Sequence, residues 1–373
     1  QKDLQKRLAS LNTVANIKGK KLELHPLGAS TVESLLTDIP VVKTDKHWKE
    51  HIGKLNRLKS YQPGLPGNLQ AQLRPYQVEG VLWLDRLHEW GVGCCLADDM
   101  GLGKTIQALS IMLKYAQDGP GLVIAPSSVC ANWEKEITRF APTLKPQVLK
   151  NQNRGTTLKK LSGHDVLIVS YGIIQSNPDL LSTREWNIVV LDEAHAIKNS
   201  KSVRSRAVMK LKANFRILTT GTPIQNHLGE LWNLFQFMNP GMLGTQEQFL
   251  KKYSNGSVTG RNSTPGNNAS GGDQNRSALN RYIAPFILRR NKIDVLDDLP
   301  EKTEITLHVS LSEQERAMYE VLRERAIAQI GGMDPSGGTR HMQILAEITR
   351  LRQMSCHPLL VDPGSKLPSS KLD

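Results

Sequence analysis

The segment at residues 96–105, Leu-Ala-Asp-Asp-Met-Gly-Leu-Gly-Lys-Thr, constrains the fold of this chain more than any other feature. It stands between an apolar run and a helical pattern. Gly101 and Gly103 allow backbone N–H groups to surround phosphate oxygens. Lys104 can neutralise the β and γ phosphates of a nucleotide, and Thr105 can offer its hydroxyl to Mg²⁺. The segment therefore predicts a phosphate-binding loop before a helix whose positive end also favours phosphate.

One position departs from the strict phosphate-loop pattern, because Asp98 stands where that pattern has glycine. The shorter core Gly-Leu-Gly-Lys-Thr is retained at residues 101–105. Taken alone, this core leaves a second interpretation open, a glycine-rich turn that begins an ordinary helix. Other motifs must decide between the two.

A second segment, residues 186–195, reads Trp-Asn-Ile-Val-Val-Leu-Asp-Glu-Ala-His. Its apolar run predicts a buried strand with carboxylates at the carboxyl end, the edge where open α/β sheets bind ligands. Asp192 is suited to hold Mg²⁺ through water, and Glu193 to orient or activate the attacking water. The alternative interpretation of these residues is a polar loop that closes a core strand. The presence of a phosphate-binding loop in the same chain makes that alternative less favoured. His195 has no second His or Cys at metal-ligand spacing nearby, so we interpret it as a polar coupling residue.

The composition is that of a soluble globular chain with a basic excess. Of 373 residues, 39% are hydrophobic and 22% are charged. Lysine and arginine total 48 against 35 for aspartate and glutamate, which gives a net charge of +13 and a pI near 9.5. This excess indicates a polyanionic partner. Nucleic acid is the first candidate and a membrane surface is the second.

Other signals bound the cellular setting. No run of about 18 apolar residues occurs, so no segment is expected to span a membrane. Residues 1–30 lack the apolar centre of a signal peptide, and the chain starts at Gln1, which suggests a fragment or a processed form. The four cysteines, at 94, 95, 130 and 356, show no Cys-x-x-Cys spacing. We therefore expect an intracellular, reduced protein rather than a disulfide scaffold or a zinc site.

Apolar strands alternate with amphipathic helices from about residue 73 to residue 240, which predicts an α/β fold with a parallel sheet and crossover helices. The expected strands are Cys94–Ala97, Leu122–Ala125, Val166–Val169, Ile188–Leu191 and Phe215–Thr219. The expected helices between them are Tyr76–Trp90, Thr105–Gln117 and Cys130–Phe140.

We expect a short N-terminal segment before this domain and a helical protrusion after it. We assign no activity to residues 1–69, and we expect a hinge near their end, at Pro63–Gly67. The nucleotide-binding lobe spans residues 70–310, and its Gly-, Asn- and Ser-rich stretch at 254–277 is expected to be a flexible surface loop. The protrusion and a linker span residues 311–373. Its expected helices are Ser312–Ile330 and Arg340–Ser355.

The order of motifs along the chain matches a known pattern. The motifs are Leu-Arg-Pro-Tyr-Gln at 73–77, Gly-Leu-Gly-Lys-Thr at 101–105, Ala-Pro-Ser at 125–127 with Asn132-Trp133, Asp-Glu-Ala-His at 192–195, Thr-Gly-Thr-Pro-Ile-Gln-Asn at 220–226, and Phe-Ile-Leu-Arg-Arg at 286–290. From about residue 70 onwards the chain resembles the sucrose-non-fermenting (SWI/SNF-type) branch of superfamily-two helicase-like ATPases. That family shares Asp98 and the Gly-Glu-Leu-Trp at 229–232. Thr219 stands where leucine is usual, a difference that we expect to affect packing more than chemistry.

The resemblance implies a RecA-like lobe of the P-loop NTPase class that uses ATP and Mg²⁺. It implies that Lys104 and Glu193 are catalytic and that Thr105 and Asp192 hold Mg²⁺. The implied ATP-binding residues, with Gln77 at the adenine, are Gln77, Asp99, Met100, Gly101, Leu102, Gly103, Lys104 and Thr105. The implied coupling residues are His195, Thr220, Gly221 and Thr222. By residue type alone, the segment 220–226 also suits a polar strand-to-helix turn.

The candidate for DNA contact is the basic segment, defined as residues 198–216. It holds seven basic residues and no acid: Lys198, Lys201, Arg204, Arg206, Lys210, Lys212 and Arg216. Because a solvated helix face normally mixes both signs of charge, contact with DNA phosphates is the favoured interpretation. Such binding depends on salt and hardly on base sequence. For Arg289 and Arg290, DNA contact and structural ion pairs near the acidic stretch 294–298 are equal alternatives.

The resemblance thus implies the first motor lobe of a DNA-dependent ATPase that translocates on duplex DNA and remodels complexes of DNA with an unidentified bound protein. A second RecA-like lobe is expected after residue 373 and supplies arginine fingers. This chain alone is therefore expected to be weakly active, since an arginine finger is worth about 10³ to 10⁵ in rate. The alternatives are a strand-separating or RNA helicase and a nucleotide-dependent DNA-binding switch. The expected compartment is the bacterial cytoplasm or nucleoid, with the nucleus as the eukaryotic alternative and no membrane partner.

Overall fold

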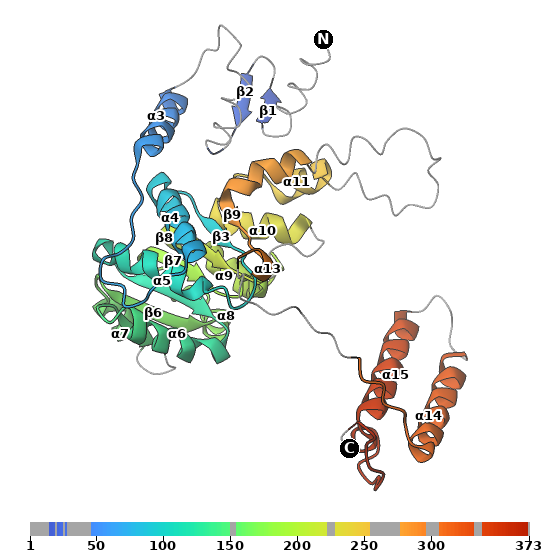
Figure 1. Ribbon diagram of the computed structural model, residues 1–373. Helices are drawn as coiled ribbons and strands as arrows, with labels where there is room; N and C mark the ends of the chain where they lie inside the picture. Colours follow the sequence, from blue (N-terminus) through green and yellow to red (C-terminus); the bar gives the residue numbers. More distant parts are fainter. Residues whose placement is uncertain are drawn as a thin grey trace. The chain divides into compact units, whose positions relative to one another are not determined.

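The computed structural model describes residues 15–18, 21–24, 27, 46–149, 154–221, 228–253, 277–295, 306–331 and 338–371. The chain divides into two compact units, residues 1–298 and residues 299–373 (Figure 1). Within the described ranges, no helix is both long enough and apolar enough to cross a membrane.

A seven-stranded sheet forms the centre of the first unit, and all of its neighbouring strands pair in parallel (Figure 1). The order across the sheet is β5, β6, β4, β7, β8, β3, β9. The strands are β3 Cys94–Leu96, β4 Gly121–Ala125, β5 Lys145–Val148, β6 Asp165–Ser170, β7 Glu185–Leu191, β8 Lys212–Thr219 and β9 Ile287–Leu288. The predicted α/β fold with a parallel sheet is confirmed.

Both edge strands, β5 and β9, lie outside the five predicted strands. The sequence of β5 is Lys-Pro-Gln-Val, and its first residue is exposed. An edge strand has a partner on one side only, so it tolerates proline and polar side chains that a central strand excludes. β9 consists of Ile287 and Leu288 alone, which is too short to give a periodic pattern.

Two groups of helices flank the sheet (Figure 1). In the first group, α5 packs against both α4 and α6; in the second, α9 packs against both α8 and α10. The first group is α4 Pro75–Trp90, α5 Lys104–Lys114 and α6 Ser127–Phe140. The second group is α8 Tyr171–Ser176, α9 Val203–Met209, α10 Leu228–Met238 and α11 Gln246–Tyr253, which packs on α10. The three helices predicted between the strands are confirmed, although α5 ends before Gln117 and α6 begins before Cys130.

Other elements complete the described part of the first unit. They are the pair β1 Ala15–Lys18 and β2 Lys21–Leu24, the helices α3 Lys46–Ser60, α7 Arg154–Lys160, residues 277–283 and α13 Lys292–Val295, and the 3₁₀ turns η2 Ala116–Asp118, η3 Ala194–Ile197 and η4 Ala284–Phe286. The predicted flexible loop at 254–277 lies outside the described residues, apart from residue 277 at the start of a helix.

The expected hinge at Pro63–Gly67 is fastened to the domain. The backbone N–H of Gly64 donates to Asp85 of α4 at 3.0 Å, and the carbonyl of Gly64 accepts from Lys114 of α5 at 3.0 Å. Asp85 also accepts from Lys114 at 2.7 Å and from the hydroxyl of Tyr115 at 2.7 Å. Burial opposes ionisation of Asp85, but these hydrogen bonds outweigh it and lower its pKa. The segment before α4 is therefore bound to α4 and α5 at Gly64.

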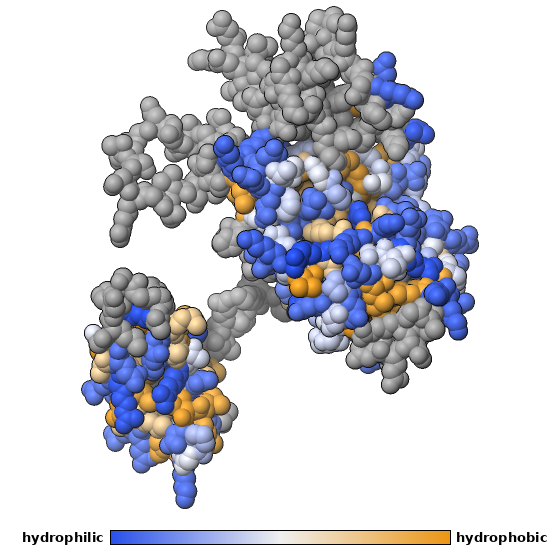
Figure 2. Space-filling view, turned by 180° about the vertical axis from the view of Figure 1, so that it is seen from behind, coloured by the Kyte–Doolittle hydropathy of each residue, from blue (hydrophilic) through white to orange (hydrophobic). Residues whose placement is uncertain are grey.

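The second unit is a helical hairpin, as predicted, in which α14 Glu313–Gly331 packs against α15 Gly338–Cys356, followed by the 3₁₀ turn η5 Pro358–Leu360. Glu315 is buried and accepts hydrogen bonds from the backbone and hydroxyl groups of both Ser312 and Ser370. This carboxylate therefore ties the end of the described chain to the start of α14. Figure 2 shows apolar side chains among the polar ones on this unit, and Ile327, Met342 and Leu345 are exposed.

Candidate nucleotide-binding site

The predicted phosphate-binding loop follows β3 and ends in α5. Gly101 and Gly103 have φ angles of 85° and 77°, in the left-handed region that favours glycine. A Cβ atom at Gly103 would lie 2.4 Å from the side-chain amide nitrogen of Gln77. Both glycines are therefore favoured by backbone conformation, and a side chain at Gly103 would also displace the Gln77 amide.

Lys104 is the first residue of α5, and its side chain reaches back to the loop. Its ammonium group donates to the carbonyl of Asp98 at 2.7 Å and to the carbonyl of Asp99 at 3.1 Å. Burial lowers the pKa of this ammonium, and the nearby carboxylates of Glu193, Asp98 and Asp192 oppose that shift. The ammonium is thus a fixed positive charge among backbone oxygens, and phosphate oxygens are chemically able to replace them.

Asp98, the departure from the strict pattern, anchors the loop. Its carboxylate is fully buried and pairs with the guanidinium of Arg290 at 2.5 Å. Asp98 also accepts from the backbone N–H of Arg290 at 3.0 Å, and Arg290 donates to Gln107 of α5 at 2.9 Å. Of the two alternatives left open for Arg290, the structural ion pair is the one observed, with Asp98 as the partner. Arg289 is exposed.

Asp192 follows β7 and is held from three directions. It accepts from the indole N–H of Trp133 at 2.8 Å, from the hydroxyl of Thr219 at 2.5 Å and from the backbone N–H of Glu193 at 3.0 Å. The expectation that Thr219 affects packing more than chemistry is wrong, because its hydroxyl contacts the predicted metal-binding carboxylate. The contact joins residues far apart in the sequence, so a local pattern could not show it.

Glu193 has φ 49° and ψ 56°, a left-handed backbone that is uncommon for a residue with a side chain. Such a conformation costs about 1–3 kcal/mol and occurs preferentially at functional sites. Its carboxylate lies 3.1 Å from Nδ1 of His195, so His195 contacts the predicted catalytic carboxylate. Among the described residues, no group of three His, Cys, Asp or Glu side chains is arranged to hold a metal ion.

A cleft of about 710 Å³ brings these groups together. Its lining includes Met100, Gly101, Gly103, Lys104 and Thr105 of the loop, together with Asp192 and Glu193. Side chains of α6 for which the sequence predicted no role also line it: Val129, Asn132, Lys135, Glu136, Arg139 and Phe140. Burial raises the pKa of Glu136, and the charge of Asp192 acts in the same direction. The spacing of these positions along α6 is the signal that could have identified one helix face.

Gln77 lies beside the loop and outside the lining of this cleft. Its amide oxygen accepts from the backbone N–H of Arg74 at 3.0 Å, and its amide nitrogen donates to the carbonyl of Leu102 at 3.3 Å. These bonds cap α4 and tie it to the loop. Contact with adenine stays a prediction for Gln77.

The start of the coupling segment adjoins the loop. Thr220 is buried, and its backbone N–H donates to the carbonyl of Leu96 at 3.1 Å. A Cβ atom at Gly221 would lie 3.1 Å from the side chain of Met100. Thr222, the remaining predicted coupling residue, lies outside the described residues.

In the basic segment, several cations bond one by one to residues from other parts of the chain, and they do not converge on the cleft. Lys198 pairs with Glu230 at 3.2 Å, Arg204 donates to Gln175 at 2.9 Å, and Lys210 pairs with Asp179 at 2.7 Å. Lys201 and Arg206 are exposed. Acids and amides from other parts of the chain therefore reach a segment that has no acid of its own.

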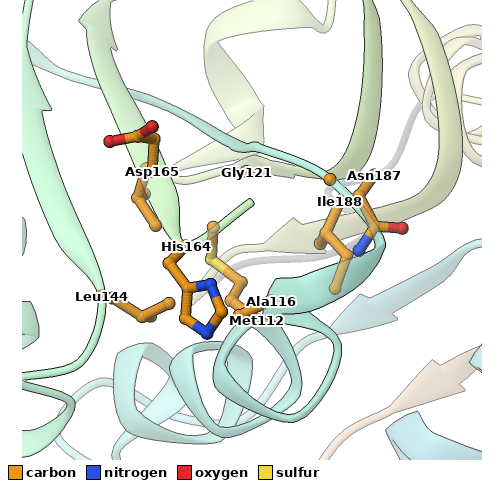
Figure 3. A pocket seen from close by; sticks show the side chains of 10 residues that line it. Met112, Ala116, Gly121, Leu144, His164, Asp165, Asn187 and Ile188 are labelled. Carbon is orange, nitrogen blue, oxygen red and sulfur yellow. The ribbon is translucent and has the colours of Figure 1, made fainter. Parts of the chain in front are cut away.

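A second, much smaller cavity lies where the central strands begin, at the opposite edge of the sheet (Figure 3). His164, Asp165, Asn187 and Met112 are among its lining residues, and its volume is about 10 Å³. That volume accommodates about one water molecule. The large cleft is therefore the candidate nucleotide site.

Comparisons with known proteins identify the family of the chain. The SNF2-related domain matches residues 76–360. The chain is 38% identical over 303 residues to YwqA of Bacillus subtilis, covering 79% of this chain and 32% of that protein. It is 35% identical over 319 residues to the chromatin-remodeling ATPase INO80 of Arabidopsis thaliana, covering 80% of this chain and 21% of that protein.

Among solved structures, the chain is similar to the SWI2/SNF2 ATPase core of Sulfolobus solfataricus in complex with dsDNA, with 35% sequence identity and a TM-score of 0.56. The match covers 84% of this chain and 64% of that one. The chain spans about a third or less of the length of the two curated relatives. The RecA-like fold and the resemblance inferred from the motifs are both confirmed, and the chain belongs to the SNF2-related family of ATPases.

Proposed function

We propose that this chain is the first motor lobe of a DNA-dependent ATPase, which binds ATP with Mg²⁺ and duplex DNA and uses hydrolysis to translocate and to remodel protein–DNA complexes. The observation that carries the proposal is the convergence of Lys104, Thr105, Asp192 and Glu193 on one cleft. A cation, a hydroxyl and two carboxylates in one cleft match the requirements of phosphoryl transfer to water.

The donor set fits Mg²⁺. The hydroxyl of Thr105 and the carboxylate of Asp192 are hard oxygen ligands that line the same cleft. Mg²⁺ usually takes one or two protein ligands and completes its shell with water and phosphate oxygens. When bound there, the cation would neutralise charge that develops on the phosphates.

Each remaining residue has a role that its chemistry supports. The backbone N–H groups of residues 99–103 would surround the phosphates, and Lys104 would stabilise the charge on the γ phosphate. Glu193 would accept a proton from, or orient, the attacking water, with His195 fixing its carboxylate at 3.1 Å. Gln77 would contact adenine through its amide.

Contact with DNA is proposed for Lys198, Lys201, Arg204 and Arg206, and coupling for His195, Thr220, Gly221 and Thr222. The first assignment is supported by the similarity to the Sulfolobus ATPase core, which was solved in complex with dsDNA. The approach of Gly221 to Met100 supports the second, because it joins the coupling segment to the phosphate-binding loop. A second RecA-like lobe would supply arginine fingers, and the protein would act inside the cell.

The test is ATP turnover by the longest available form of the protein, with and without duplex DNA. Glu193→Gln removes the carboxylate charge at the reacting water and is expected to lower turnover by about 10²–10⁴-fold. Glu185→Gln is the matched control, because Glu185 is an exposed glutamate at the other end of the same strand. Unchanged turnover in Glu193→Gln would refute the assignment.

Two further measurements separate the alternatives. Unwinding of a forked duplex would favour a strand-separating helicase, and stimulation by RNA alone would favour an RNA helicase. A change of DNA affinity on ATP binding, without turnover in any form, would favour a nucleotide-dependent DNA-binding switch. Turnover that duplex DNA stimulates, without strand separation, is the expected result.

A further inference from the structure

Thr219 is the last residue of β8, and β8 lies between β7 and β3 in the sheet. β7 leads to Asp192, and β3 leads to the phosphate-binding loop. Thr219 is in parallel register with Leu96 at the end of β3. The residue therefore stands between the two halves of the nucleotide site, at the edge where the strands end.

The side chain of Thr219 is polar in an apolar position. It is fully buried, and the residues on the same face of β8, Phe215 and Ile217, are buried and apolar. A buried hydroxyl is costly unless it forms a hydrogen bond. Its partner is the carboxylate of Asp192, at 2.5 Å. A leucine at this position would leave that carboxylate without this donor.

The bond has a defined effect on the orientation of Asp192. Oδ1 accepts from both the Thr219 hydroxyl and the backbone N–H of Glu193, whereas within the described part of the chain Oδ2 accepts from Trp133 alone. A carboxylate offers about four lone-pair sites, so the free one lies on Oδ2. Donors from β8 and α6 on the two oxygens also fix the plane of the carboxylate.

We propose that Thr219 is a positioning residue for the metal-binding carboxylate. Its hydroxyl occupies Oδ1 of Asp192 and presents Oδ2 to a divalent cation or to a water of its shell. A hydrogen bond from a hydroxyl to a carboxylate belongs to the charge-assisted class. The proposal rests on the proposed function, because it assumes that Asp192 serves a cation bound with the nucleotide.

The test uses nucleotide binding to this chain, measured by calorimetric titration of ATP at a series of Mg²⁺ concentrations and in EDTA. Thr219→Val keeps the shape of the side chain and removes the hydroxyl. We expect a rise of about ten-fold in the Mg²⁺ concentration at which the affinity for ATP is enhanced half-maximally. Hydrogen bonds to charged groups contribute about that factor or more. Affinity in EDTA is expected to be unchanged, which a general loss of packing would not produce.

Thr219→Ser restores a hydroxyl and is expected to return the Mg²⁺ midpoint to within about two-fold of the parent value. Thr138→Val is the control for loss of a hydroxyl, because Thr138 bonds to the carbonyl of Glu134 on the exposed surface of α6. In an Asp192→Asn background, Thr219→Val is expected to cause no further shift, since the two residues act as one unit.

The outcomes separate the two proposals. If the parent chain shows no Mg²⁺-dependent binding of ATP, the proposed function fails. If the parent shows it, Asp192→Asn loses it and Thr219→Val matches the parent, the positioning role is overturned and the proposed function stands. Thr219→Ala is a second variant without the hydroxyl. If both hydroxyl-free variants lose the fold, the hydroxyl serves the sheet and the positioning role is likewise overturned.

Discussion

The nucleotide cleft and the basic segment both concentrate charge, but they hold it in different ways. In the cleft, Lys104 and Asp192 are fixed by backbone and side-chain hydrogen bonds, and both face the same space. In the basic segment, Lys198 and Lys210 each pair with an acid from another element, and both Lys210 and Lys201 are exposed. Charges that converge on one space can act on a ligand together. A cation that is paired within the protein offers less of its charge to a ligand, and an exposed pair adds little stability.

The largest expected effect concerns the ion pair that anchors the loop. Arg290→Ala leaves the buried carboxylate of Asp98 without its cation and is expected to destabilise the first unit by about 3–5 kcal/mol. The measurement is denaturant unfolding followed by tryptophan fluorescence, since all six tryptophans lie before residue 299. Arg289→Ala is the matched control, expected within about 0.5 kcal/mol of the parent because Arg289 is exposed. Equal stability of the two variants would remove the distinction between fixed and exposed charges.

This pair also shows how far the sequence could predict the structure. The parallel sheet, its central strands and the flanking helices follow from local patterns, since apolar runs and helical spacing are properties of neighbouring residues. Asp98 and Arg290, which bond through both the backbone and the side chain of the arginine, are 192 positions apart. Each alone is an ordinary charged residue. Nothing in either segment indicates the partner, so the pair could be recognised only in the folded chain.

The same limit applies to the candidate site. Lys104, Thr105, Asp192 and Glu193 could be predicted because phosphate chemistry restricts residue type and spacing within each motif. Trp133 and Thr219 contact Asp192 across 59 and 27 positions, and no spacing rule links them. For the basic segment, counting charge identified the residues but could not show that Glu230 and Asp179 approach them.

A second prediction tests whether the position of a lysine within the cleft determines its effect on ATP binding. Lys104→Ala removes the cation that the loop holds and is expected to weaken ATP binding or turnover by about 10²–10³-fold, the usual cost of losing one preorganised charge-stabilising group. Lys135→Ala is the control, because Lys135 lines the same cleft from α6 but lies exposed. Calorimetric titration of ATP compares the two. If both variants lose affinity equally, position within the loop has no special importance and charge alone governs binding.

A third prediction sharpens the contrast within the basic segment. If Lys201 and Arg206 contact DNA phosphates, Lys201→Ala and Arg206→Ala are each expected to lower the slope of log affinity against log salt by about 1. Lys210→Ala is expected to change the slope less, because Asp179 already neutralises Lys210 at 2.7 Å. Duplex binding measured across a salt series gives the slopes. A slope for Lys210→Ala that matches the other two would show that pairing within the protein does not withdraw a lysine from DNA.

The smallest effect is expected from Glu315, a fixed charge that lines no part of the nucleotide cleft. The hydrogen bond from the Ser370 hydroxyl, with those from Ser312 and the Ser370 backbone, lowers the pKa of this carboxyl from 4.5 to about 2. Because the folded pKa is depressed, its stabilisation is complete above about pH 4.5, and it is lost as the pH falls toward 2. The protection factors of α14 amides, which remove the intrinsic slowing of exchange in acid, should therefore fall across that interval in the parent chain, whereas Glu315→Gln should show lower protection at neutral pH and a weaker pH dependence. Glu313→Gln, at an exposed position of the same first turn, should behave as the parent does.

ATP binding should be unchanged in both variants. A loss of ATP binding in Glu315→Gln would mean that this carboxylate also serves the nucleotide site. The division between charges that act on a ligand and charges that stabilise the chain would then not apply to Glu315.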